Sequence, residues 1–146
     1  MMPELVWAIT CKTVLTDRET NNVSYIDTIH GLAARRLPAK LPKVMLGTVW
    51  RASKPKGDTL RMLIRVESSD GQEVITWEAP IVTFEHPYHR LNIDLEGMDV
   101  PAAGDYTILV ERFSRNRWVA HAHLPFAVRM TQQEPREHRK RSAAPG

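Results

Sequence analysis

The chain of 146 residues has one cysteine and no apolar run that approaches the ~20 residues of a membrane-spanning helix. Cys11 alone cannot form an internal disulfide, so folding does not depend on an oxidising compartment. A domain of about 130 residues buries roughly two thirds of its unfolded surface, which suffices without a structural metal. No cationic segment precedes the short apolar stretch near the N-terminus. We therefore expect a cytoplasmic protein that does not contact a membrane.

Motifs for several common chemistries are also missing. None of the serines stands in a Gly-x-Ser-x-Gly elbow, and neither a Gly-x-Gly-x-x-Gly loop nor a Walker pattern occurs. Cys11 alternates with Trp7 and Ile9, which indicates a buried apolar thiol and not a nucleophile. Asp94 and Glu96 share a strand face, and a solvated face explains them without paired-carboxylate chemistry. These absences favour a protein that is not an enzyme and needs no cofactor.

Apolar side chains recur with a period of two along much of the chain, which predicts strands with one buried face. The clearest example is residues 59–67, where Leu60, Met62, Ile64 and Val66 alternate with polar side chains. The segments that we expect to be strands are residues 5–15, 23–30, 44–52, 59–67, 73–84, 91–96, 105–113 and 118–128. In the last of these, even-numbered apolar residues from Trp118 to Val128 are expected to share one side.

Turn residues separate the predicted strands, and helical signals are weak. Asp70-Gly71 between two alternating runs predicts a hairpin. Residues 32–37 are the one candidate for a short helix or turn, and Pro38 and Pro42 end it. Eight short strands without alternating helices predict an all-β fold, specifically a two-layer antiparallel β-sandwich.

A further pattern appears before the seventh predicted strand, where Leu95, Asp99, Gly104 and Tyr106 stand in the order Leu-x3-Asp-x4-Gly-x-Tyr. This pattern resembles the tyrosine corner of immunoglobulin-like sandwiches, in which the tyrosine hydroxyl ties a loop to a strand. Over most of residues 11–128 the chain also resembles short bacterial β-sandwich proteins of unknown function. The resemblance implies an immunoglobulin-like fold in which Asp99, Gly104 and Tyr106 are structural, and it implies no activity. The inter-sheet cysteine pair of immunoglobulins is absent.

The net charge of +3 is concentrated near the C-terminus. Residues 131–146 carry Arg136, Arg139, Lys140 and Arg141 against two glutamates, which leaves the rest of the chain nearly neutral. We therefore divide the chain into a β-sandwich domain, residues 1–130, and a basic tail, residues 131–146, that is expected to be flexible. The tail makes nucleic-acid association an alternative function.

Histidines supply the only metal-ligand spacing in the sequence. His121 and His123 lie two apart on a predicted strand, where they share a face, and His86 or His89 could approach as a third donor. No glutamate follows on the same strand to complete a cupin-type ligand set. We favour two histidines on a partly solvated sheet face and no bound metal.

Basic and aromatic residues raise the possibility of a nucleic-acid platform on a sheet. Arg61 and Arg65 share a polar face, and Trp77, Tyr88 and Trp118 could stack on bases. The four tryptophans are, however, spread over the first, third, fifth and eighth predicted strands, as core side chains would be. An ordinary charged sheet surface is the preferred interpretation.

The sequence therefore favours a non-enzymatic protein-binding or assembly module whose partner is another protein or a second copy. The expected contact elements are residues 7–13, as an exposed sheet edge, and the 85–90 loop, whose Tyr88 and Arg90 are types enriched at interfaces. One alternative is a small-ligand or metal-dependent sandwich enzyme that uses His121, His123 and the loop from His86 to Arg90. The second alternative is the nucleic-acid module that uses the basic tail.

Overall fold

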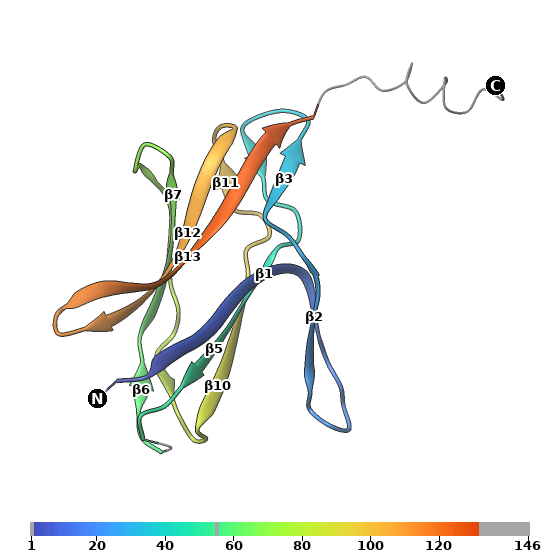
Figure 1. Cartoon of the computed structure of the whole chain (residues 1–146). Coiled ribbons are helices and arrows are strands. Elements are labelled where there is room, and N and C mark those ends of the chain that lie inside the picture. Colours follow the sequence, from blue (N-terminus) through green and yellow to red (C-terminus); the bar gives the residue numbers. More distant parts are fainter. Residues whose placement is uncertain (1, 55, 132–146) are drawn as a thin grey trace.

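Two β-sheets form the fold in the computed structural model, which describes residues 2–54 and 56–131. One sheet has the strand order β10-β5-β1-β2 and the other the order β3-β13-β12-β7-β8 (Figure 1). The strands of the first sheet are β1 (Glu4–Thr16), β2 (Val23–Thr28), β5 (Met45–Arg51) and β10 (Tyr88–Asp94). Those of the second are β3 (Gly31–Ala34), β7 (Met62–Ser68), β8 (Glu73–Glu78), β12 (Gly104–Ser114) and β13 (Arg117–Met130).

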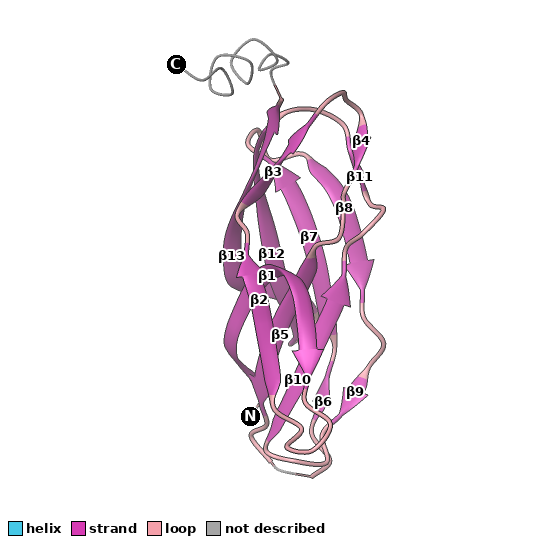
Figure 2. Cartoon of the chain, turned by 90° about the vertical axis from the view of Figure 1, so that its right-hand side faces the viewer, coloured by secondary structure: helices cyan, strands magenta, loops and turns pink. Residues whose placement is uncertain are grey.

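Two short antiparallel pairs complete the strands. β4 (Ala39–Lys40) pairs with β11 (Asp99–Val100), and β6 (Thr59–Leu60) pairs with β9 (Val82–Thr83) (Figure 2). The predicted all-β sandwich is confirmed, with thirteen strands among the described residues in place of about eight. The predicted strands at 59–67 and 73–84 are each divided in two. The two-residue strands are too short to show the alternation of apolar and polar residues from which strands were predicted. Within the described residues there is no helix and hence none that could cross a membrane.

The topology is immunoglobulin-like. The neighbours β1-β5-β10 follow the A-B-E order of immunoglobulin domains, and β13-β12-β7-β8 follow the G-F-C order with an added C′ strand. All ladders are antiparallel except that between β3 and β13. β2, β3 and β4 lie between the A and B equivalents in the chain, and β2 forms a hairpin with β1.

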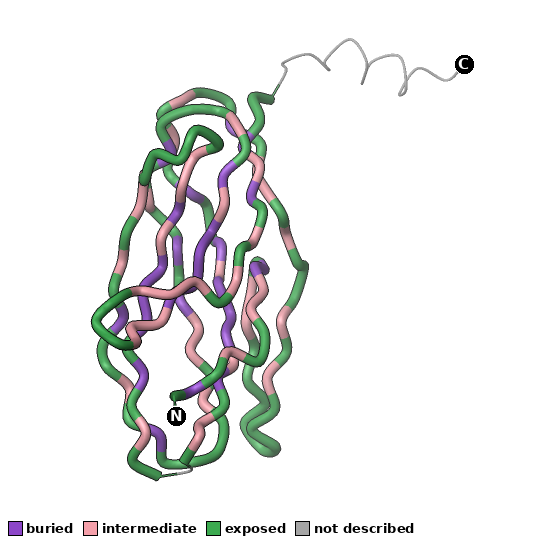
Figure 3. The backbone as a smooth tube through the Cα atoms, turned by 60° about the vertical axis from the view of Figure 1, so that its left-hand side comes forward, coloured by how far each residue is buried: buried purple, intermediate pink, exposed green. Residues whose placement is uncertain are grey.

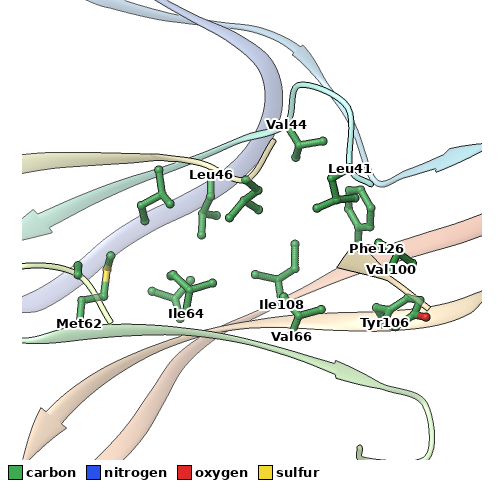
Figure 4. Packing of buried hydrophobic residues seen from close by; sticks show 14 of the residues in the cluster. Leu41, Val44, Leu46, Met62, Ile64, Val66, Val100, Tyr106, Ile108 and Phe126 are labelled. Carbon is green, nitrogen blue, oxygen red and sulfur yellow. The ribbon is translucent and has the colours of Figure 1, made fainter. Parts of the chain in front are cut away.

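Alternating side chains from both sheets fill the space between them (Figure 4). Leu60, Met62, Ile64 and Val66 are all at most 7% exposed, as their period predicts. The apolar core that they join contains Leu41, Val44, Leu46, Trp50, Ala79, Phe84, Ile93, Leu95, Val100, Tyr106, Ile108, Val110, Phe126 and Val128. Figure 3 shows the buried segments within the strands of both layers. The core thus holds the sandwich together without a disulfide.

Residues 32–37, the candidate for a short helix or turn, contain no helix: residues 32–34 belong to a strand and residues 35–38 form a bend. Gly31–Ala34 forms β3, a parallel partner of β13 from Ala127 to Met130. A Cβ atom at position 31 would collide with the carbonyl oxygen of Ala127, so only glycine permits this close approach. Pairing with β13 satisfies the backbone polar groups of a segment too short for a stable helix.

A bulge in β13 overturns the prediction that Trp118 shares a side with Val128. Val110 of β12 pairs with Ala122, whereas its neighbour Glu111 pairs with Ala120, so His121 is the extra residue. Because of this extra residue, the residues of β13 before His121 lie on the opposite faces of the sheet from those that were predicted. Trp118 consequently packs on the outside of the sandwich, with its ring 5.2 Å from that of Phe113 and 5.1 Å from the guanidinium of Arg61.

Tyr106 makes the hydrogen bond that characterises a tyrosine corner. Its ring is 6% exposed, and its hydroxyl donates to the backbone carbonyl of Ala102 at 2.5 Å. Gly104 between them adopts a φ of +150°, a conformation that other residues rarely adopt. Asp99 lies in β11 and forms an exposed ion pair with Lys40 at 2.9 Å. The corner therefore depends on Gly104 and Tyr106, while Asp99 joins the β4–β11 pair.

We expect Tyr106→Phe to lower the free energy of unfolding by about 1 to 3 kcal/mol, because the hydrogen bond from the buried Tyr106 side chain to the carbonyl of Ala102 is lost. Urea unfolding followed by tryptophan fluorescence measures the change. Tyr88→Phe is the matched control, since Tyr88 is 57% exposed and its change should stay within about 0.5 kcal/mol. Equal midpoints for Tyr106→Phe and wild type would contradict the structural role of the hydroxyl.

Candidate functional site

Two large aromatic side chains are exposed on the outer face of the β10-β5-β1 sheet. Trp7 of β1 and Tyr88 of β10 are 40% and 57% exposed. Trp7 pairs in register with Val49 of β5, and Val49 pairs with Arg90 of β10. Opposite residues of neighbouring strands share a face, so these side chains lie on one surface. That surface lies on the side of the sheet away from the core.

The hairpin of β1 and β2 folds over this surface. β1 pairs with β5 from Glu4 to Cys11 and with β2 from Cys11 to Thr16, so its second half leaves the sheet with β2. Figure 2 shows β2 in front of the β5 and β10 layer. In the connecting turn, the Asp17 carboxylate accepts hydrogen bonds from the backbone N–H groups of Glu19 and Thr20, which lower the pKa of Asp17.

Tyr25 of β2 fixes the hairpin against the sheet. Its ring lies over Gly47 of β5, where a Cβ atom would collide with the ring carbon Cε1 of Tyr25. The ring meets Trp7 edge to face at 5.0 Å, and its hydroxyl donates to Oδ1 of Asn92 at 3.0 Å. Burial raises the pKa of Tyr25, so the hydroxyl stays protonated at neutral pH. Three strands of the sheet thus contact one side chain of the hairpin.

A groove of about 590 Å³ lies between the hairpin and the sheet. Its lining consists of Trp7, Val23, Tyr25, Val49, His86, Tyr88, His89 and Arg90. This lining contains one permanent positive charge, on Arg90, and no carboxylate. Arg90 donates a long hydrogen bond of 3.4 Å to the carbonyl of Asn21 in the hairpin. Burial lowers the pKa of His89, which packs edge to face on Phe84 at 5.8 Å.

The two contact elements expected from the sequence meet at this groove. Among the described residues, β5 is the one strand that pairs with Trp7 to Thr10, as expected for a sheet edge, whereas from Cys11 onward β1 pairs with β2. The hairpin adds β2 beside β1, and the alternating pattern of β1 contained no sign of this pairing. Tyr88 and Arg90 lie in β10, and Trp7 contributes its side chain and not its backbone.

His121 and His123 do not share a face, because the bulge at His121 separates them. His121 packs against Trp50 of the core at 6.0 Å and accepts a hydrogen bond from Nε of Arg112 at 3.3 Å. His123 instead pairs with Leu109 in register. Burial, and then the charge of Arg112, lower the pKa of His121. In the described part of the chain, no three histidine, cysteine or acidic side chains are grouped as metal ligands.

The arginines proposed for a nucleic-acid platform already have partners. Arg61 pairs with Glu78 at 2.5 Å and stacks on Phe113 at 4.5 Å. Arg65 pairs with Glu111 at 3.0 Å and with Glu73 at 3.7 Å. These carboxylates neutralise the arginines that a nucleic acid would need to contact on this face.

Cys11 and the basic tail are the other parts of the chain that the sequence singled out. Cys11 is fully buried, as predicted, and burial raises the pKa of its thiol. The four basic tail residues, Arg136, Arg139, Lys140 and Arg141, lie outside the described residues.

Sequence reasoning missed Tyr25 as part of a site, and it included Trp7 only within the expected strand edge, residues 7–13. Trp7 was expected in the core, yet only Trp50 of the four tryptophans is fully buried. The available signal was Gly47 in the middle of an apolar strand, since an interior strand glycine often marks the close approach of another group. That group is the ring of Tyr25.

Comparisons with known proteins place the chain in a family. No curated protein matches it in sequence. Among solved structures it is similar to an immunoglobulin-like protein from Pseudomonas aeruginosa, with 14% sequence identity and a TM-score of 0.46 over 88% of this chain and 98% of that one. The model of a family of unknown function, DUF6941, matches residues 6–129. The chain therefore belongs to the DUF6941 family.

Proposed function

We propose that the protein is a non-enzymatic protein-binding module whose groove takes an extended segment with apolar side chains and carboxylates. The observation that carries this proposal is the exposure of Trp7 and Tyr88 on one concave surface with Val49 between them. Tryptophan, tyrosine and arginine are the residues most enriched among the energetically dominant contacts of interfaces. All three types line this groove.

The charge of the groove selects the partner. Arg90 is the permanent charge of the lining, and no aspartate or glutamate lies beside it to neutralise it. A carboxylate on the partner would form a charge-assisted pair with the guanidinium, while a lysine or arginine there would be repelled. Apolar side chains of the same segment would cover Val49 and the two exposed rings.

The hairpin supports binding because it is already fixed in place. Tyr25 packs over Gly47 and bonds Asn92, so the groove wall is ordered before any partner arrives. A preformed wall reduces the conformational entropy lost on binding. The groove volume of about 590 Å³ holds a few side chains of a peptide.

The other functions considered have weaker support. A metal-dependent enzyme needs its histidines together, and the bulge separates His121 from His123. Nucleic-acid binding through the tail stays a prediction, because Arg136, Arg139, Lys140 and Arg141 lie outside the described residues. A single-stranded nucleic acid at the groove would find aromatic rings but only one permanent cation.

The groove is tested by titrating isotope-labelled protein with a hexapeptide of alternating aspartate and leucine, followed by NMR. We expect the indole N–H signal of Trp7 to shift, and expect Tyr88→Ala and Arg90→Gln each to weaken binding at least about tenfold, or about 1.4 kcal/mol. Ile81→Ala is the matched control, because Ile81 is 65% exposed outside the groove lining and should leave affinity unchanged.

A hexapeptide of alternating lysine and leucine and a deoxythymidine decamer test the chemistry of the partner. Neither should shift the Trp7 signal. Tighter binding of the decamer than of the acidic peptide would replace the protein partner by a nucleic acid. Failure of the acidic peptide to bind, or unchanged affinity in both groove variants, would reject the proposal.

Gly47→Ala should destabilise the protein by about 1 to 3 kcal/mol, because the added methyl group displaces the Tyr25 ring. In a Tyr25→Ala background the same substitution should cost less than about 0.5 kcal/mol, since the colliding ring is gone. Urea midpoints of the four proteins in this double-mutant cycle give the coupling. An equal cost in both backgrounds would show that Tyr25 does not hold the hairpin on Gly47.

A further inference from the structure

A second concave site lies between the N-terminal segment and the β12–β13 hairpin. The cleft has a volume of about 740 Å³. It is lined by Met2, Glu4, Leu5, Arg112, Ser114, Arg115, Arg117, Val119 and His121. None of these residues lines the groove between the β1–β2 hairpin and the sheet, which contains Trp7 and Tyr88 and is called the aromatic groove. The N-terminus and the turn of the hairpin lie at the same end of the molecule in Figure 1.

Arg112 points into the sandwich at this end. Tyr106, Ile108 and Val110 of β12 alternate toward the core, and Arg112 is the next residue in that alternation. It lies opposite Met62 of β7, which is fully buried, and opposite Val119 of β13. Because opposite residues share a face, the guanidinium enters the space between the sheets. A charged side chain, that of Arg112, therefore occupies a position at which the alternation of β12 predicts an apolar side chain.

The guanidinium of Arg112 has an unmatched buried nitrogen. Its Nε donates to His121, but Nη1 is buried and has no hydrogen-bond partner in the described part of the chain. Burial lowers the pKa of Arg112, and the charge of Glu4 acts in the opposite direction. A buried polar atom without a hydrogen bond is costly, and unsatisfied groups of this kind occur at functional sites.

The carboxylate near Arg112, that of Glu4, already forms an ion pair with another arginine. Glu4 contributes to the electrostatics of Arg112 but forms its ion pair with Arg51 at 2.5 Å. Arg65 and Glu111 also have buried atoms outside hydrogen-bonding geometry, yet these two side chains pair with each other at 3.0 Å. Within residues 2–54 and 56–131, no ion pair includes Arg112.

Two more arginines reach the cleft from the turn of the hairpin. Arg115 and Asn116 adopt positive φ values of 54° and 64°, which form the tight turn that places Arg115 and Arg117 on the cleft lining. The lining thus carries three arginines against one glutamate that Arg51 neutralises. Met2, Leu5 and Val119 supply apolar surface beside these charges.

We propose that this cleft binds a small organic phosphate, with the phosphate on Arg112 and the turn arginines and its apolar body against Leu5 and Val119. Planar guanidinium groups match phosphate oxygens through paired hydrogen bonds, and a dianion complements several arginines better than a single carboxylate does. The anion would pair with the guanidinium of Arg112 on the side that lines the cleft. Nothing in this assignment depends on the aromatic groove.

The experiment is calorimetric titration of the full chain with phenyl phosphate. We expect one site per chain, at least tenfold weaker binding in Arg112→Gln, and threefold to tenfold weaker binding in Arg115→Gln and Arg117→Gln. Arg129→Gln is the charge-matched control, because Arg129 is exposed and pairs with Asp105 at 2.7 Å outside the cleft. Its affinity should stay within twofold of wild type.

Arg112→Met separates binding from a structural role. An apolar side chain of similar length removes the uncompensated charge, so its Tm without ligand should equal or exceed that of wild type while phenyl phosphate binding is lost. A purely structural arginine would give a lower Tm instead. Because Arg115 and Arg117 are exposed, their variants test the site even if a change at Arg112 prevents folding.

Two further probes define the ligand class. Inorganic phosphate should bind more weakly than phenyl phosphate if the apolar lining contributes, and benzoate should bind at least tenfold more weakly. Equal affinity for benzoate would overturn the assignment to phosphate. The absence of phenyl phosphate binding to wild type, or equal affinity in Arg112→Gln and wild type, would overturn the site itself.

Discussion

The apolar core that β5 and β12 share across the sandwich supports every other feature of this protein. In immunoglobulins a disulfide joins the corresponding strands, and its second cysteine lies two residues after the corner tyrosine. Here that position is Ile108, which is 2% exposed in the core that also contains Leu46 (Figure 4). Close-packed aliphatic side chains replace the covalent link, so the sheets stay together without an oxidising compartment.

Both candidate sites extend from these two strands. The outer face of β5 carries Val49 at the groove, opposite the side that Leu46 buries in the core. The inner face of β12 continues past Val110 to Arg112 at the cleft. Rigid strands position side chains more accurately than loops do, because packing on one face restricts the other. The same core contact therefore fixes the geometry of the groove and of the cleft.

β1 belongs both to the sheet and to the hairpin that forms the wall of the groove. Its first half extends the sheet beside β5, and its second half leaves with β2 as a hairpin. Gly47 permits this arrangement because any larger residue would collide with Tyr25. Tyr25 in turn orders Trp7 and Asn92, so the wall and the floor of the groove are held by one side chain.

The sequence by itself determined the long strands and most of their buried faces, because alternation is a local property of each strand. The burial of Ile64 and Val66 and the placement of Tyr106 at a strand start could be predicted from neighbouring residues alone. Only the tertiary structure decided what covers each outer face and where a ladder gains a residue. The bulge at His121 depends on the pairing of β13 with β12, and it separated His121 from His123 and moved Trp118 outside. The meeting of Trp7, Tyr25 and Tyr88 likewise depends on contacts between strands distant in sequence, which no local pattern records.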